Sequence, residues 1–332
     1  MKFLSDKALQ RLREGAETPD LAGTRYRLLE RVARGGMGVV YAAEDEKLQR
    51  RVALKVLEVP GADGDLSNRL IREARVLAQL EHPGIVPVHD VGTLPDGRVF
   101  YTMKFVEGQR LDKFIESVPS IPDRLRLFLR ICEAVAFAHS RHVLHRDLKP
   151  ANIMVGPFGE VLVMDWGLAK VTAVVLQADE TASSAGVHPE RVASHGTSHS
   201  AILGTPGFMS PEQAGGQTAV DHGTDIFSLG AILWFMLAGS APGEPFPESA
   251  GLPRPLRAIC EKAMAADPNQ RYQSARQMTA DLANYLAGEP VTAHPESLVE
   301  RVGRIYARHR TAVLLVAIYL LMRVLFIIFT RR

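Results

Sequence analysis

The chain has 332 residues, 46% hydrophobic and 23% charged, and a formal net charge of +2. This is the composition of a globular protein that can bury one or two large cores, and the near-neutral charge gives no indication of a nucleic-acid-binding surface. The chain has two cysteines, Cys132 and Cys260, which argues against a disulfide framework or a cysteine-based metal site and fits a reducing compartment.

Residues 1–25 are predicted to form an N-terminal extension. The first 17 residues, MKFLSDKALQRLREGAE, lack the continuous apolar core of a signal peptide. Their apolar residues recur at helical spacing, which predicts a short amphipathic helix that packs on the rest of the chain or frays.

Residues 26–58 alternate apolar runs with glycines and a charged turn, a pattern typical of strands. The glycines of RGGMGVVY lie between two such runs, where backbone N–H groups can surround a phosphate, although an ordinary hairpin has the same pattern. Lys55 lies on the next predicted strand, in the apolar setting VALKVL. A lysine there either extends to water or pairs with an anion.

The segment 66–80 has helical spacing, with Glu73 on the surface of the predicted helix. Two or three strands follow within 82–108, and helices dominate from Asp123 onward. The sequence therefore predicts an α+β protein in which a small β-rich lobe precedes a larger helical lobe, with a hinge near 106–109. Residues 172–203 show little periodicity and are predicted to form a long loop.

Charged and polar residues gather in the apolar stretch VLHRDLKPANIMV, residues 143–155. Burying such groups unpaired would be costly, so they need partners. Asp147 could accept a proton from a hydroxyl nucleophile, and Lys149 could neutralise charge on a transferred phosphoryl group. Asn152, together with Asp165 of VMDWGLAK, supplies the oxygen ligands that Mg²⁺ prefers. A polar turn with a satisfied internal ion pair is the alternative interpretation.

Together these segments resemble the bacterial eukaryotic-type (Hanks-type) serine/threonine protein kinases. The resemblance covers residues 26–288 and rests on the glycine loop, VALK, Glu73, HRDLKPAN, DWG and GTPGFMSPEQA. Asp225 matches an aspartate that opens a buried helix in the family, and Arg271 and Glu212 match a family ion pair. The resemblance implies a two-lobed protein kinase fold, with ATP and Mg²⁺ as cofactors.

The resemblance also implies roles for individual residues. Asp147 would be the catalytic base, Lys149 would contact the γ-phosphate, and Lys55 would contact the α- and β-phosphates and pair with Glu73. Asn152 and Asp165 would bind Mg²⁺. The implied ATP-binding residues are Val32, Ala33, Arg34, Gly35, Gly36, Met37, Gly38, Val40, Ala53, Lys55, Met103, Val106 and Met154.

Three positions depart from the family pattern. Lys104 takes a hinge position where the family often has glutamate, which should be tolerated because the hinge contacts adenine through its backbone. Ala33 replaces the first glycine of the loop, which should restrict the loop without abolishing ATP binding. Trp166 replaces the phenylalanine of the usual DFG motif, and a second large aromatic ring should preserve the packing there.

Regulation and docking are also implied by the resemblance. Arg146 precedes Asp147, and family members with this arginine often need a phosphate on the activation loop. The candidate phosphosites are Thr197, Ser198 and Ser200, while Thr205 resembles a structural threonine near the substrate. Residues 240–251 are too short and too rich in proline and glycine to form the usual docking helix, which predicts weak or altered substrate docking.

Residues 289–310 are predicted to be a basic juxtamembrane linker and residues 311–330 a transmembrane helix. The latter segment holds thirteen Leu, Ile, Val or Phe residues. They favour insertion by about −4 to −8 kcal/mol, against at most about +3.5 kcal/mol for Arg323. The arginines before the segment predict a single-pass protein of the inner or plasma membrane with its kinase domain in the cytoplasm. A hydrophobic helix packed on the kinase domain is the alternative.

The predicted function is transfer of the ATP γ-phosphate to Ser or Thr hydroxyls of proteins, including the chain's own activation loop. The predicted partners are protein substrates and a lipid bilayer, without nucleic acid, and a homodimer for trans-autophosphorylation is left open. A membrane-tethered pseudokinase or scaffold is the alternative function, although the full set of catalytic residues favours activity. A small-molecule phosphotransferase is disfavoured by the long loop and by GTPGFMSPEQ, which resemble a platform for protein substrates.

Overall fold

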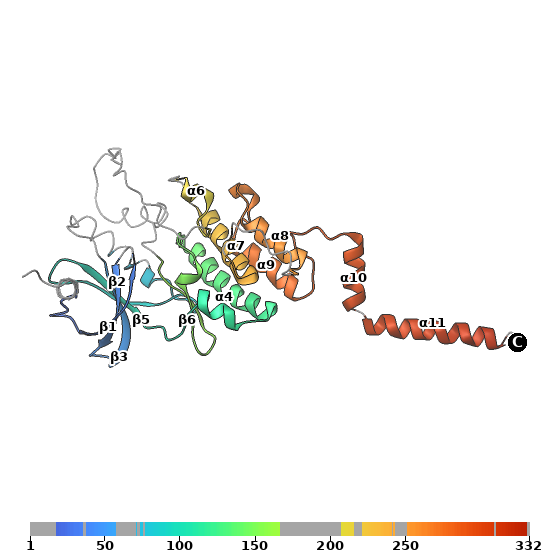
Figure 1. Ribbon diagram of the computed structural model, residues 1–332, viewed down its shortest axis with the longest axis horizontal. Helices are drawn as coiled ribbons and strands as arrows, with labels where there is room; N and C mark the ends of the chain where they lie inside the picture. The colour runs from blue at the N-terminus through green and yellow to red at the C-terminus, as the bar shows by residue number, and fades with distance from the viewer. Residues whose placement is uncertain are drawn as a thin grey trace, which may run out of the picture.

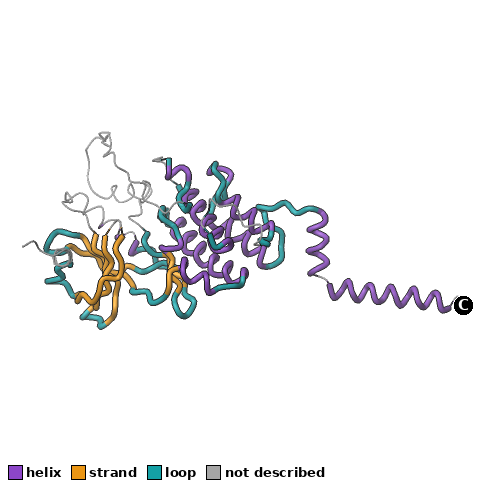
Figure 2. Tube along the Cα trace, in the orientation of Figure 1, coloured by secondary structure: helices purple, strands orange, loops and turns teal. Residues whose placement is uncertain are grey.

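The computed structural model describes residues 18–35, 38–57, 71, 74–75, 77–166, 207–215, 221–240, 242, 251–308 and 310–330. A β-sheet lobe at the N-terminal end lies beside a helical lobe (Figures 1 and 2). The predicted order of a β-rich lobe followed by a helical lobe is therefore confirmed.

The first lobe is built on one antiparallel sheet with the strand order β1-β2-β3-β5-β4. Its strands are β1 (Tyr26–Gly35), β2 (Gly38–Asp45), β3 (Arg50–Leu57), β4 (Val88–Thr93) and β5 (Val99–Lys104). Side chains from β1, β2, β3 and β5, among them Leu54 and Phe100, form a hydrophobic core. The predicted helix is present at residue 71 and at the described residues of 74–78.

The second lobe combines a small sheet with helices. The sheet consists of β6 (Gln109–Arg110), β7 (Ile153–Val155) and β8 (Val161–Val163). The helical elements are α3 (Leu111–Phe114), η1 (Ile115–Ser117), α4 (Ile121–Ser140), η2 (Pro150–Asn152), α6 (Pro211–Ala214), α7 (His222–Ala238), α8 (Arg254–Ala263), η4 (Pro268–Gln270) and α9 (Ala275–Leu286).

Helix α7 lies at the centre of the helical lobe, and α4 and α8 pack against it. Most of its side chains are buried, which explains why its sequence is apolar on all sides rather than on one face. The Asp221 side chain caps its N-terminus by accepting from the Gly223 N–H, and Gly239 ends it with a φ of 76°. Because α7 is packed on several sides, a polar side chain on it, such as that of Asp225, is held in a fixed position.

Helix α6 is tied to the helical lobe by a buried ion pair between Glu212 and Arg271. Arg271 donates from Nη1 and Nη2 to the two Glu212 carboxylate oxygens, at 2.7 and 2.8 Å, and also donates to the Ala265 and Gly223 carbonyls. Its side chain is 0% exposed. Burial alone would raise the pKa of Glu212, but the hydrogen bonds from Arg271 and from its other donors together outweigh burial and lower that pKa to about 2.

Two helices follow the helical lobe: α10 (Leu298–Arg308) and α11 (Arg310–Thr330). Ser297 and Glu300 form a capping box at the start of α10. Arg304 of α10 pairs with Glu296 at 2.8 Å and with Glu289 at 3.6 Å, so the predicted linker contains a helix held by ion pairs.

Helix α11 covers the segment for which the sequence predicts a transmembrane helix. Within the described part of the chain, no helix is both long and apolar enough to cross a membrane. The predicted N-terminal amphipathic helix lies outside the described residues, as does most of the segment 240–251.

The Glu212–Arg271 pair yields a stability prediction. Glu212→Ala leaves a buried guanidinium without its carboxylate, so the free energy of unfolding at pH 7 should fall by about 3–5 kcal/mol in urea titrations. The control is Glu261→Ala, which breaks the exposed Arg257–Glu261 pair on α8 and should cost under about 1 kcal/mol.

The same pair predicts a pH dependence. Because the pKa of Glu212 is lower in the folded chain, its stabilising effect is full above the unfolded value of 4.5 and is lost as the pH falls towards 2. The stability difference between wild type and Glu212→Gln should therefore shrink across this range. A difference that stays constant down to pH 3 would contradict the assigned pair.

Candidate active site

The backbone between α4 and β7 is fixed by one buried carboxylate, that of Asp225 on α7. Its Oδ2 accepts from the His145 N–H at 2.8 Å and lies 2.8 Å from His139 Nε2. Its Oδ1 accepts from the Arg146 N–H at 2.8 Å. Arg146 adopts a φ of 66°, a left-handed conformation that an arginine adopts only under such constraint. The direction of the chain entering Asp147 is thus set by α7.

His145 connects this loop to the segment after β8. Burial lowers the pKa of His145 and keeps its ring neutral. In the tautomer that satisfies both neighbours, Nε2 donates to the Met164 carbonyl at 2.9 Å and Nδ1 accepts from the Asp147 N–H at 3.3 Å. The loop that carries Asp147 is therefore held next to the segment that carries Asp165.

Asp147, Lys149 and Asn152 form a compact cluster. Lys149 Nζ donates to both Asp147 carboxylate oxygens, at 3.0 and 2.8 Å. Asn152 Nδ2 donates to the Asp147 carbonyl at 2.8 Å and to its Oδ2 at 3.1 Å. The Asp147 carboxylate is still 43% exposed, so it is oriented by its neighbours and open to a reactant. A small pocket beside it is lined by residues of this loop together with Phe208, Met209 and Gln213.

Lys55 extends from the sheet lobe to the helical lobe, where it pairs with Asp165. It is 6% exposed although it lies on a strand of apolar residues. Burial lowers the pKa of Lys55, but nearby Tyr101 and Asp165 raise it by more, so the ammonium stays charged. Asp165 has a φ of 53°, which is strained for an aspartate. The ion pair between Lys55 and Asp165 therefore links the sheet lobe to the helical lobe.

The side-chain oxygen atoms of Asn152 and Asp165 suit a hard divalent cation. The amide nitrogen of Asn152 is committed to Asp147, which leaves its Oδ1 as the atom that can bind a cation. The Asp165 carboxylate is 44% exposed and supplies a second oxygen donor. Among the described residues, no group of three or more His, Cys, Asp or Glu side chains could hold a metal. Two protein oxygens nevertheless suffice for a metal that is also bound by substrate phosphates.

The sheet brings several predicted ATP-binding residues together. In the β2–β3 pairing Val40 is opposite Lys55, and in the β3–β5 pairing Ala53 is opposite Met103. Val32, Ala33, Arg34 and Gly35 lie on β1, Gly38 begins β2, Val106 follows β5, and Met154 lies on β7 in the other lobe. Gly36, Met37, Glu73, Thr197, Ser198, Ser200 and Thr205 lie outside the described residues.

Two residues of the site were missed by the sequence analysis. Tyr101 is opposite Lys55 in the β3–β5 pairing, and Lys55 Nζ lies 6.0 Å from the centre of its ring. Strand register is needed to see this. Gln213 donates from Nε2 to the Arg146 carbonyl at 2.8 Å, whereas Asp225 accepts from the Arg146 N–H. A glutamine three residues after Ser210 was readable as a capping box, but not as a support for the loop.

The protein kinase domain family matches residues 26–288 of this chain. The chain belongs to the protein kinase family. Similar relatives are the serine/threonine-protein kinases PknD of Chlamydia caviae (36% identity over 297 residues), Protochlamydia amoebophila (35% over 307) and Chlamydia muridarum (38% over 300). The alignments cover 79–80% of this chain but 30–32% of those proteins, so the chain spans about a third of their length.

A solved structure supports the same assignment. The kinase domain of Mycobacterium tuberculosis PknI is similar with a TM-score of 0.58 and 25% sequence identity, over 80% of this chain and 96% of that one. Membership of the family implies use of ATP and of a divalent metal, with which the oxygen donors at Asn152 and Asp165 agree.

The kinase differs from the usual family pattern at Trp166, and the structure shows what the indole adds. Its Nε1–H donates to the Val163 carbonyl at 3.2 Å, and its ring lies 4.7 Å from that of His145. Phenylalanine could make the ring contact but not the hydrogen bond. Trp166 therefore holds the segment after Asp165 against β8.

Trp166 can be tested by comparing two substitutions. Trp166→Phe should lower the free energy of unfolding by about 1 kcal/mol, since it removes only the hydrogen bond. Trp166→Ala should cost about 3–5 kcal/mol, because it also empties the space of the ring. Urea titrations in which Trp166→Phe is as stable as wild type would show that the indole hydrogen bond contributes nothing.

Proposed function

We propose that this chain is an active serine/threonine protein kinase, which transfers the terminal phosphate of ATP to Ser or Thr hydroxyls of proteins. The observation that carries the proposal is the convergence of Asp147, Lys149, Asn152, Lys55 and Asp165 on the junction of the two lobes. These are the groups needed to position a hydroxyl and a nucleoside triphosphate in line.

In the proposed reaction the substrate hydroxyl oxygen bonds to the γ-phosphorus, while the bond from that phosphorus to the bridging oxygen breaks and ADP leaves. Asp147 orients the hydroxyl and accepts its proton, since the carboxylate is held by Lys149 and Asn152 but exposed. Lys149 neutralises charge on the transferred group, and Lys55 holds the α- and β-phosphates. A Mg²⁺ ion bound through Asn152 and Asp165 would supply positive charge to the phosphates.

The pseudokinase alternative requires a defect in this machinery. No described member of the catalytic set is replaced by a side chain that could not do its chemistry, and Lys55 retains an ionic partner across the lobes. Activity is therefore the proposal that the site supports better.

The chemistry is tested by two substitutions. Asp147→Asn should lower kcat by about 10²–10⁴-fold, since it removes the base while keeping the shape of the side chain. Lys55→Met should lower kcat/KM for ATP by a similar factor. Purified protein with labelled ATP, Mg²⁺ and a generic protein substrate provides the assay. The matched control is Asp123→Asn, an exposed carboxylate on α4, which should leave the rate unchanged. A wild-type kcat for Asp147→Asn would contradict the proposed mechanism.

We also propose that phosphorylation of the activation loop regulates this activity. Arg146 sits in the loop directly before Asp147, so a phosphate that pairs with it would act on the catalytic loop itself. Thr197, Ser198 and Ser200 are the proposed acceptors, and Thr205 is the proposed structural threonine near the substrate. Phosphosite mapping of the protein from the assay above identifies which of them carry phosphate.

We further propose that the kinase acts at a membrane, attached through α11 with the kinase domain in the cytoplasm. Of its described side chains, large apolar ones such as Leu314, Leu321 and Phe326 are 50–68% exposed. In Figure 1, α11 extends away from both lobes. A helix with so much exposed apolar surface favours transfer to lipid.

Fractionation tests this attachment. Full-length protein should sediment with membranes and resist alkaline carbonate, whereas a chain ending at Arg308, which keeps α10 and its ion pairs, should be recovered without detergent and remain active. Release of the full chain by carbonate would indicate attachment at the surface rather than insertion. Recovery of the full chain without detergent would contradict membrane attachment altogether.

A further inference from the structure

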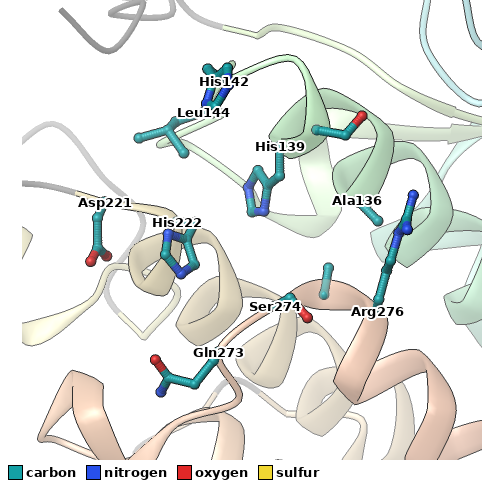
Figure 3. A pocket seen from close by; sticks show the side chains of 11 residues that line it. Ala136, His139, His142, Leu144, Asp221, His222, Gln273, Ser274 and Arg276 are labelled. Carbon is teal, nitrogen blue, oxygen red and sulfur yellow. The ribbon is translucent and has the colours of Figure 1, made fainter. Parts of the chain in front are cut away.

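A cavity of about 390 Å³ lies in the helical lobe, where the end of α4 meets the beginnings of α7 and α9. Figure 3 shows it from close by, with the His139 ring between His222 on one side and Arg276 on the other. Its lining includes Ala136, His139, His142, His222, Ser274 and Arg276. None of these residues belongs to the ATP- or substrate-binding set, so the cavity has no role in the reaction described above.

The chemistry of the lining favours an anion. Arg276 is always charged, and the imidazoles of His142 and His222 can each donate a hydrogen bond. The acidic residue of the lining, Asp221, already accepts from the Gly223 N–H at 2.7 Å. The first turn of α9, which begins after Ser274, adds the positive end of a helix dipole.

The size of the cavity sets a second limit on its occupant. A volume of about 390 Å³ exceeds that of a single phosphate or carboxylate group and falls within the range of small-molecule sites. Ala136, Leu144 and Ala275 provide an apolar part of the wall that can contact a short carbon skeleton. The lining therefore suits a small molecule with one anionic group.

The His139 side chain connects the cavity to the catalytic loop. His139 lines the cavity, and its Nε2 lies 2.8 Å from Asp225 Oδ2. Asp225 in turn holds the backbone N–H groups of His145 and Arg146. The rings of His139 and His222 are 6.2 Å apart, so one ligand group can contact both.

We propose that this cavity is a regulatory site for a small phosphorylated or carboxylated metabolite, which acts on the catalytic loop through His139 and Asp225. A ligand hydroxyl that donates to His139 Nδ1, such as that of hydrogen phosphate or of a phosphorylated polyol, fixes the ring orientation in which Nε2 donates to Asp225. The ligand thereby stabilises the backbone conformation at His145 and Arg146 that places Asp147.

The test uses full-length protein in detergent with a non-hydrolysable ATP analogue filling the nucleotide site. Calorimetric titrations are made with three probes: inorganic phosphate, glycerol 3-phosphate and succinate. At least one should bind, and comparison of the three separates phosphate from carboxylate recognition. Arg276→Gln and His222→Ala should each weaken that binding by about tenfold or more. The control Arg257→Gln, an exposed arginine on the neighbouring α8, should leave it unchanged.

A second measurement tests the connection to the catalytic loop. Hydrogen exchange at the amides of His145 and Arg146 should slow when the binding probe is added to wild-type protein, and not when it is added to Arg276→Gln. The site is refuted if no probe binds at about 10 mM, or if Arg276→Gln and His222→Ala bind as tightly as wild type. Binding without any change in exchange at those two amides would refute the regulatory role.

Discussion

The buried carboxylate of Asp225 is the constraint on which the catalytic geometry depends. It is 0% exposed, and burial alone would raise its pKa, but hydrogen bonds from His139 and from the backbone of the catalytic loop lower it instead. A buried charge of this kind is stable only while those donors stay in place. The loop conformation and the ionised state of Asp225 therefore depend on each other. Because Asp225 lies on the centrally packed α7 and binds the N–H groups of His145 and Arg146, it fixes the position of Asp147.

The second constraint is the ion pair that links the lobes. Lys55 reaches from β3 to Asp165, whose strained backbone is flanked by the Met164 carbonyl that binds His145 and by the Trp166 indole that binds β8. His145 also touches Trp166. The two catalytic segments thus both contact one buried histidine, His145. Local strain at Asp165 is held by several independent contacts, as is common where geometry serves chemistry.

Much of this arrangement could be predicted from the sequence, because it depends on local patterns. Alternating apolar runs indicated the β-rich lobe, helical spacing indicated the second lobe, and a lysine among apolar residues singled out Lys55. Contacts set by tertiary structure could not be predicted in this way. Tyr101 is recognised only from strand register, Gln213 only from the approach of α6 to the loop, and the docking of α10 only from its ion pairs. The cavity beside His139 is formed by three helices that are distant in sequence, so no local sequence pattern predicts it.

The most direct test of the account is Asp225→Asn, which keeps the size of the side chain and removes its charge. The kinase should remain folded by circular dichroism and should bind ATP with an affinity close to that of wild type, because Lys55 and the sheet lobe are untouched. Its kcat should fall by about a hundredfold, since Asp147 is no longer held in place. A folded Asp225→Asn protein that transfers phosphate at the wild-type rate would contradict the central role given to this carboxylate.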